Sequence, residues 1–347
     1  TGAGSRWNNS QDLTVGHYGN GTLNINNGGV VSNVVGSVGR ASGTTGVVTI
    51  SGTGSHWNNS KSLTVGGIEG STSHGSGGHG TLTVEAGGMV SNTYGYIGGA
   101  DGSTGVATVT GSDSRWINSD SLTVGNASNG TLNITDGGVV SSASGVIARH
   151  SNNSTVTVSG ANSRWNNSGS LTVGWEGEGV LTIDAGGTVS NTDAYIGWNQ
   201  SAKGEVIVNG AGSTWMNSGD LHVGIEENAY NTTNGSLSIT DGGFVNVSGT
   251  VHLYSNNTIN INGGSLVTPT LDLKANSSAT LNSGVLWVNH FTGEGRLTWN
   301  GGTLQISNPN GLAVGRNDPF GGLMNIGINQ RLLVTGTTTI ERDASIT

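Results

Sequence analysis

A repeat of about 25 residues is the feature of this sequence that most limits how the chain can fold. The string W-x-N-S recurs at intervals of 50, 59, 49 and 50 residues, at Trp7, Trp57, Trp116, Trp165 and Trp215. Each copy is followed by an L-x-V-G segment and then by a G-x-L-x-[IV]-x-x-G-G-x-V segment. The longer unit divides into two similar halves, because nine successive landmarks from Val15 to Val223 lie 23 to 32 residues apart. Such a period predicts a repeat protein in which each unit packs against its neighbours.

The composition favours strands over helices. Glycine occupies 63 of the 347 positions and would interrupt almost every helical window. Each unit contains three short segments with apolar residues at alternate positions, and a strand of this kind cannot bury its apolar face alone. We therefore expect an all-β chain that forms a right-handed parallel β-helix, with about 25 residues and three short strands per rung. A β-propeller is the alternative fold, because its blades span 40 to 50 residues.

Alternation along the strands predicts which side chains point into the β-helix. Leu13, Val15, Leu23 and Ile25 are expected inside, on the first two faces of the rung. On the third face the inward position alternates between a large and a small residue, in the order Trp7, Val31, Trp57, Val90, Trp116, Val140, Trp165, Val189, Trp215 and Val245. This pattern indicates a layered core in which each indole lies between rungs that carry a smaller residue.

A second register follows two residues after each of these positions. It contains Asn33, Asn59, Asn92, Asn118, Asn167, Asn191 and Asn217, with Ser142 as the exception. Stacked asparagines can hydrogen-bond to one another and to the turn backbone, so we expect a structural ladder at a corner of the rung.

The regularity of the repeat divides the chain into two parts. Residues 1–248 carry alternating Trp-type and Gly-Gly-type rungs, whereas residues 249–347 lack the Trp motif. The second part contains the related segments Gly-Gly-Ser-Leu at 263–266 and Gly-Gly-Thr-Leu at 301–304, and all three prolines. We expect it to continue the same β-helix with shorter, irregular rungs.

The two repeat motifs resemble those shared by passenger regions of bacterial type V secretion (autotransporter) proteins and by some exported proteins with the PEP-CTERM sorting signal. The resemblance covers roughly residues 1 to 248. It implies a right-handed β-helix that is displayed outside the cell at the bacterial surface, as an adhesin or a self-associating protein. The chain lacks the leader and the membrane barrel of a complete autotransporter, so the resemblance implies a processed or excised part.

Charge and composition exclude several classes of partner. The formal charge is −9, with 12 Lys plus Arg and no basic run, so a nucleic-acid partner is not expected. No apolar stretch reaches the roughly 18 to 20 residues that span a bilayer, so this segment is not expected to insert into a membrane. The absence of cysteine excludes disulfides and thiolate metal sites.

The candidate binding residues lie where the repeat varies in length. The insertions follow the V-G landmark and would project from one edge of the solenoid, where repeat proteins tend to bind. Exposed aromatic residues gather near this edge and could stack on sugar rings or on another copy of the chain. The predicted ligand-binding residues are Trp175, Glu176, Tyr195, Trp198 and Tyr230.

Evidence for catalysis or for a cofactor is weak in the sequence. One corner carries Glu176 and Glu178, and Glu226 with Glu227 would lie two rungs further on, about 10 Å away. This separation is close to the roughly 6.5 to 9.5 Å of inverting glycosidases. His74 and His79 lie in the longest loop without a second cluster of ligands, so neither a metal site nor a cofactor is expected. Outward threonine rows could order water, as in ice-binding solenoids, but Val47, Val106 and Glu205 interrupt them.

Two functional hypotheses follow. The first is a non-enzymatic extracellular scaffold for adhesion or self-association, whose partners are cell-surface glycans or other copies of the chain, stacked end to end into fibres. The second is a polysaccharide-degrading enzyme, a lyase or a hydrolase.

Overall fold

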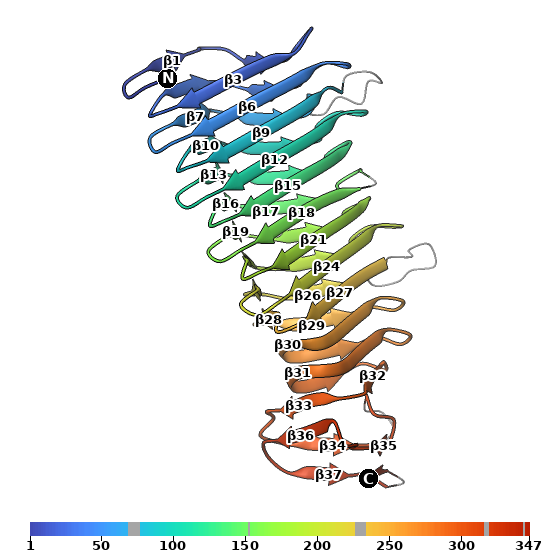
Figure 1. Cartoon of the computed structure of the whole chain (residues 1–347). Coiled ribbons are helices and arrows are strands. Elements are labelled where there is room, and N and C mark those ends of the chain that lie inside the picture. The colour runs from blue at the N-terminus through green and yellow to red at the C-terminus, as the bar shows by residue number, and fades with distance from the viewer. Residues whose placement is uncertain (69–76, 152, 226–233, 316–318, 343) are drawn as a thin grey trace.

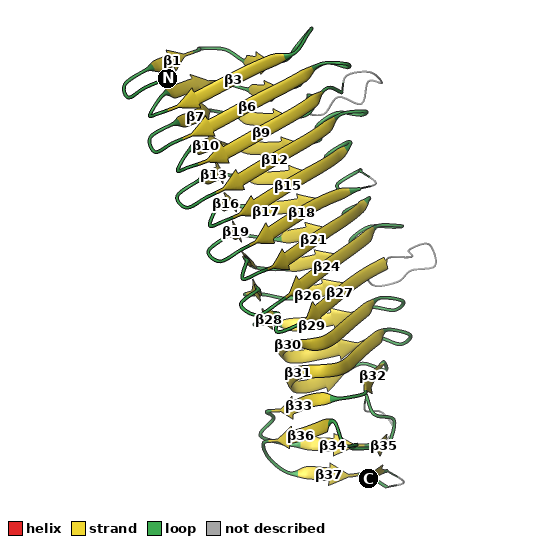
Figure 2. Cartoon of the chain, in the orientation of Figure 1, coloured by secondary structure: helices red, strands yellow, loops and turns green. Residues whose placement is uncertain are grey.

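The computed structural model describes residues 1–68, 77–151, 153–225, 234–315, 319–342 and 344–347, and every regular element in this part of the chain is a β-strand (Figure 2). The strands wind around one long axis, from the N-terminal rung at the top of Figure 1 to the C-terminal rung at the bottom. Each strand from β1 to β26 pairs in parallel with the strand three places further along the chain. The next three strands, β27 to β29, all pair with one long strand, β30. This pairing confirms the predicted parallel β-helix.

Each rung consists of three strands, one on each face. The first face contains the L-x-V strands: β2 (Leu13–Val15), β5 (Gly36–Val38), β8 (Ser62–Val65), β11 (Tyr94–Ile97), β14 (Ser121–Val124), β17 (Ser144–Ile147), β20 (Leu171–Val173), β23 (Ala194–Ile196), β26 (Leu221–Val223) and β29 (Thr250–Leu253). The second face contains β3 (Gly21–Asn26), β6 (Thr45–Ser51), β9 (His79–Glu85), β12 (Thr104–Thr110), β15 (Asn129–Thr135), β18 (Ser154–Ser159), β21 (Glu178–Asp184), β24 (Lys203–Asn209) and β27 (Asn234–Thr240). The third face contains β1 (Arg6–Asn8), β4 (Val30–Asn33), β7 (His56–Asn59), β10 (Met89–Asn92), β13 (Arg115–Asn118), β16 (Val139–Ser142), β19 (Arg164–Asn167), β22 (Thr188–Asn191), β25 (Thr214–Asn217) and β28 (Phe244–Val247).

The later rungs continue the stack with longer strands and a shorter period. The strand β30 (Thr258–Leu273) runs through all three faces, since it pairs with β27, β28 and β29 in turn. In the next rung β31 (Ser278–Thr292) pairs Ser278 with Thr258, twenty residues earlier. The remaining strands are β32 (Arg296–Trp299), β33 (Gly302–Ile306), β34 (Leu312–Val314), β35 (Leu323–Met324), β36 (Gln330–Val334), β37 (Thr338–Ile340) and β38 (Ser345–Ile346).

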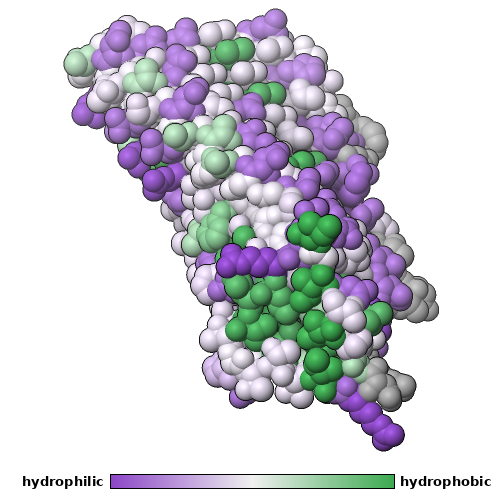
Figure 3. Space-filling view, turned by 60° about the horizontal axis from the view of Figure 1, so that its bottom comes forward, coloured by the Kyte–Doolittle hydropathy of each residue, from purple (hydrophilic) through white to green (hydrophobic). Residues whose placement is uncertain are grey.

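The C-terminal end carries exposed apolar side chains. Leu323, Ile328 and Ile340 belong to the last turns and are half or fully exposed. Figure 3 looks toward this end and shows hydrophobic surface gathered there. The last rung has a neighbour on one side only, so its inner side chains are not covered by a following rung.

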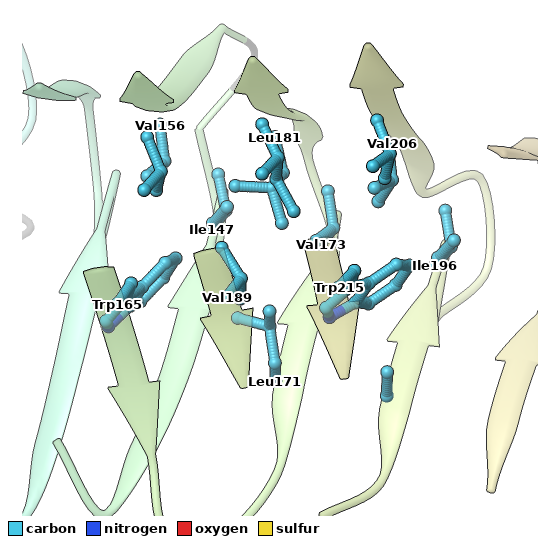
Figure 4. Packing of buried hydrophobic residues seen from close by; sticks show 14 of the residues in the cluster. Ile147, Val156, Trp165, Leu171, Val173, Leu181, Val189, Ile196, Val206 and Trp215 are labelled. Atoms are coloured by element: carbon cyan, nitrogen blue, oxygen red, sulfur yellow. The ribbon is translucent and has the colours of Figure 1, made fainter. Parts of the chain in front are cut away.

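The core has the layered arrangement that the sequence predicts. Trp57, Trp116, Trp165 and Trp215 are fully buried, and valines of the intervening rungs lie between them (Figure 4). Trp7 differs from the prediction, because 49% of its surface is exposed. It belongs to the first described rung, which is covered on one side only.

Large and small residues compensate for one another within each rung. The rung that contains Trp116 carries Gly95 at the inward position of its first face, and the next rung carries Leu122 and Val140 at these two positions. A Cβ atom on Gly95 would press against the Trp116 indole and the Leu122 side chain. The interior therefore keeps a similar volume from rung to rung, as close packing requires.

The indoles are also held by the asparagine register. Trp116 Nε1 donates to Asn92 Oδ1 at 2.7 Å, and Asn92 Nδ2 donates to Asn118 Oδ1 at 2.6 Å. The same pair of bonds links Trp57 to Asn33 and Asn33 to Asn59. A buried indole N–H needs an acceptor, and the asparagine side chain offsets the free-energy cost of removing that N–H from water.

Ser142, the exception in the ladder, performs the same task with one hydroxyl. It accepts the N–H of Trp165 at 3.2 Å and donates to Asn167 Oδ1 at 2.7 Å. A hydroxyl can donate and accept at once, so Ser142 makes the same two bonds that Asn92 makes to Trp116 and Asn118.

Truncation of a buried indole is expected to destabilise the solenoid strongly. Trp116→Ala should lower the free energy of unfolding by about 3 to 5 kcal/mol, because it removes a large apolar contact and leaves a cavity. Chemical denaturation of the purified chain measures this loss. Trp7→Ala is the matched control in the same motif and should cost clearly less, since Trp7 is half exposed. Equal losses in the two variants would contradict the layered core.

The asparagine ladder gives a second stability prediction. Asn92→Ala removes the buried acceptor of the Trp116 N–H and the buried donor to Asn118 Oδ1, and should cost about 1 to 3 kcal/mol. Asn92→Ser should cost less, because Ser142 already makes both bonds in the following Trp-type rung. Denaturant midpoints of both variants test this order, and a serine variant as unstable as the alanine variant would refute it.

Candidate functional site

Four of the five predicted binding residues lie in the described part of the chain, along the first face. Trp175 and Glu176 follow β20, Tyr195 lies within β23, and Trp198 follows that strand. The fifth binding residue, Tyr230, lies outside the described residues. So do Glu226 and Glu227, which were weighed as catalytic carboxylates, and His74, which was weighed as a metal ligand.

Glu176 takes part in polar contacts at the surface. Its Oε2 lies 2.7 Å from Nδ1 of His150, and its Oε1 accepts from Asn199 Nδ2 at 3.4 Å. Its side chain is 47% exposed. The neighbouring Glu178 pairs with Lys203 at 3.7 Å and is similarly exposed. Both glutamates are thus engaged with basic or amide groups of the next or preceding rung.

Tyr195 and Trp198 belong to a larger group of rings that the structure assembles on neighbouring rungs. We call this group the ring row: Tyr195, Trp198, His222, His252 and Tyr254. Parallel register places Tyr195 beside His222, and His222 beside His252, at the outward position of β23, β26 and β29. These strands lie next to one another along the solenoid (Figure 1).

The rings of this row are in mutual contact. The centroids of Tyr195 and His222 are 4.9 Å apart with an interplanar angle of 13°, and those of His222 and His252 are 4.9 Å apart at 14°. Trp198 meets Tyr195 edge to face at 4.1 Å. Tyr254 lies 6.1 Å from each imidazole. All five side chains are half-buried, so the row forms an ordered surface that remains open to solvent on one side.

Acidic groups flank the ring row. Asp193 Oδ1 accepts the backbone N–H of Asp220 at 2.9 Å, and Asp220 Oδ1 accepts that of Thr250 at 2.7 Å. Each carboxylate is thereby fixed to the following rung. Asp272 continues the outward register beyond His252 and is 10% exposed.

Asp272 is held by three neighbours. Its Oδ2 lies 3.0 Å from His252 Nδ1 and 2.9 Å from Lys274 Nζ, and its Oδ1 accepts from the Thr292 hydroxyl at 3.1 Å. Burial by itself raises the pKa of this carboxyl, but the hydrogen bonds from Lys274 and His252 outweigh it, and the pKa lies below its ordinary value of 3.8. Asp272 is therefore ionised at neutral pH.

Two titratable groups of the row, His222 and Tyr195, have pKa values that keep them neutral at neutral pH. Burial lowers the pKa of His222, and the neighbouring His252 lowers it further against the opposing effect of Asp220 and Asp193. Burial raises the pKa of Tyr195, and the charges of Asp193 and Asp220 act in the same direction. At Tyr195 and His222 the row thus presents uncharged rings beside fixed carboxylates.

A cavity adjoins the far end of this register. It has a volume of about 330 Å³ and is lined in part by His290, Phe291, Thr292, Asn308 and Pro319. Thr292 connects it to the row, because its hydroxyl donates to Asp272. The first face therefore offers an extended strip of rings and carboxylates that leads into a concave site.

Metal-ligating groups meet within the strip. Among the described residues, Asp220, His222 and His252 place one ligand atom each within 4.8 Å of one another. From the sequence, His74 and His79 were the histidines weighed for this role, and no such cluster of described residues includes His79.

Sequence reasoning missed His222, His252 and Tyr254. The signal for the two histidines was present, because each occupies the outward middle position of an L-x-V-type strand, as Tyr195 does in the preceding rung. Aligning the repeats on this position places three successive rings in one row.

Comparison with protein-family models, with curated proteins and with solved structures found no match to this chain. Within the described part of the chain, no helix has the length and hydropathy needed to cross a membrane.

The lowered pKa of Asp272 leads to a prediction about pH. A carboxyl whose pKa is lower in the folded than in the unfolded state stabilises the fold above its unfolded pKa, and this contribution disappears as pH falls through the folded value. The wild-type chain should therefore be more stable than Asp272→Asn at pH 7, and the difference should shrink below about pH 4. Thermal melts of both proteins at pH 7, 5 and 3 check this. A difference that is constant with pH would show that ionisation of Asp272 contributes nothing.

Proposed function

We propose that this chain is a non-enzymatic binding scaffold of the bacterial cell surface, which holds a glycan along the ring row. The observation that carries the proposal is the contiguous row of Tyr195, Trp198, His222, His252 and Tyr254 on neighbouring rungs, with fixed carboxylates beside it. Aromatic side chains with polar neighbours suit sugars, because a sugar presents apolar C–H faces together with hydroxyl groups.

The dimensions of the strip suit an extended ligand. At about 4.8 Å per rung, the outward register from Tyr195 to Asp272 covers about 14 Å, and Thr292 adds one further rung before the cavity. Several sugar units of a chain could contact the strip at once. Asp193, Asp220 and Asp272 supply acceptors for hydroxyl groups along this length.

The strip is preformed, so a ligand can bind without rearrangement of the backbone. The strip is built on strands that pair on both sides, so the ligand would meet side chains already in place. Preorganised sites lose less conformational entropy when they bind. Surface display, adhesion and homotypic association are proposals that rest on the resemblance of the repeats to exported passenger regions.

The alternative function, cleavage of a polysaccharide, requires two carboxylates that converge on one groove. Of the glutamates considered for this role, Glu176 contacts His150 and Asn199, while Glu178 pairs with Lys203. Both are about half exposed at the surface. These contacts favour binding over cleavage.

Substitution of one ring should weaken glycan binding. Purified chain applied to an array of oligosaccharides should retain a defined set of glycans, and Trp198→Ala should lower the affinity for them about 3- to 10-fold, since one aromatic contact contributes about 0.5 to 1.5 kcal/mol. Tyr18→Ala is the matched control, because Tyr18 is 91% exposed and stacks on His17 away from the row. An array without bound glycans, or equal losses in both variants, would contradict the proposal. Release of shortened sugars from a bound polysaccharide would support the enzyme instead.

A further inference from the structure

One carboxylate and two imidazoles come together on two adjacent rungs of the first face. Asp220, His222 and His252 each offer a ligand atom, and the three atoms lie within 4.8 Å of one another. All three side chains are half-buried, so they are accessible from solvent yet held by their neighbours. We propose that these residues bind a divalent transition-metal ion, of the class of Zn²⁺, Ni²⁺ and Cu²⁺.

The strand geometry accounts for this grouping. Side chains two positions apart in extended chain project to the same side, so Asp220, directly before β26, lies beside His222. His252 lies directly opposite His222 in the parallel register of β26 and β29. The three ligands are therefore positioned by paired backbone, which is the rigid kind of support that metal sites use.

Hydrogen bonds prepare the ligands for an ion. His252 Nδ1 donates to Asp272 Oδ2 at 3.0 Å, which leaves the lone pair of the ring on Nε2. Asp220 Oδ1 accepts the Thr250 N–H at 2.7 Å, which fixes the orientation of that carboxylate. His222 Nδ1 lies 3.3 Å from the Tyr254 hydroxyl oxygen, which can accept a hydrogen bond from an Nδ1–H group. Carboxylate partners of ligating histidines orient the ring and increase its basicity.

A modest rearrangement separates this geometry from a bound state. The two imidazole planes are within 14° of parallel, so the lone pairs of the two rings lie in nearly parallel planes and do not converge on one point. Tetrahedral zinc, with bonds of about 2.0 to 2.2 Å, needs ligand atoms about 3.3 Å apart. Rotation of one imidazole about its side-chain torsions brings the ligands together without movement of the strands. Metal binding thus exchanges the stacking of His222 and His252 for coordination.

The surrounding charges and the type of ligand select the ion. Asp193 and Asp220 act on His222, and Asp272, which also pairs with Lys274, lies against His252, so carboxylates surround the two imidazoles. Imidazole ligands suit zinc, copper and nickel, whereas calcium and magnesium prefer oxygen ligands alone. Three protein ligands leave at least one coordination position for water or for a group of another molecule.

Titration of the tag-free chain with zinc chloride in a calorimeter tests the proposal. We expect one ion per chain, and at least a tenfold loss of affinity in His222→Gln and in His252→Gln. Asp220→Asn keeps an oxygen for the Thr250 N–H but loses the charge, so it should also weaken binding. Asp272→Asn should weaken binding about 10- to 100-fold through its effect on His252.

His150→Gln is the matched control, because His150 is a half-exposed histidine that also contacts a carboxylate, that of Glu176. Its affinity for zinc should equal that of the wild type. Melting curves of all variants without metal show whether each one is folded, and titration of wild-type chain with Co²⁺ should produce a visible absorption band of a low-coordinate ion. Absence of saturable zinc binding to the wild type, or equal binding in the folded His222→Gln and His252→Gln variants, would overturn the proposal.

Discussion

Direct stacking of like strands on successive rungs is the interaction on which the rest of the structure depends. Each strand pairs in parallel with its counterparts in the rungs before and after, so every residue has defined neighbours along the axis. Because the rungs must stack without gaps, the interior of each has to fill the same cross-section. The chain meets this requirement with two combinations, a small residue with tryptophan or leucine with valine, as in Gly95 with Trp116 and Leu122 with Val140. In the rung of Trp215 the small residue is Ala194.

The same stacking solves the problem of a polar group in the core. An indole buried without an acceptor for its N–H would be costly. Asn92 accepts from Trp116 and donates to Asn118, so one residue satisfies the ring and links its own rung to the following one. Ser142 shows that the requirement is for a group that both donates and accepts, and that an amide is not essential.

On the outer side of the first face the register also brings like positions of successive rungs together. Most outward positions of the first face carry small residues such as Thr64, Thr123 and Thr172. Three consecutive rungs carry Tyr195, His222 and His252 instead, and parallel pairing converts these substitutions into a row of rings in contact. A regular scaffold can in this way create a local chemical site by single replacements, with no change in backbone. Glycan binding and metal binding are both proposed for this region because the strand register brings aromatic rings, carboxylates and imidazoles together on the same rungs.

The period of the repeat, the three strands per rung and the burial of the tryptophans could be inferred from the residues alone, because alternation and glycine turns are local properties. The expectation for Trp7 was wrong, since burial depends on a rung on both sides and local alternation does not report this. The candidate site was predicted only in part. Tyr195 and Trp198 were identified as aromatic residues near a variable edge, whereas His222 and His252 were overlooked because each occupies the variable middle position of an L-x-V-type segment. Their meeting required the alignment of strands 30 residues apart across an insertion of variable length. That alignment is made by hydrogen bonds between rungs, and only the tertiary structure decides it.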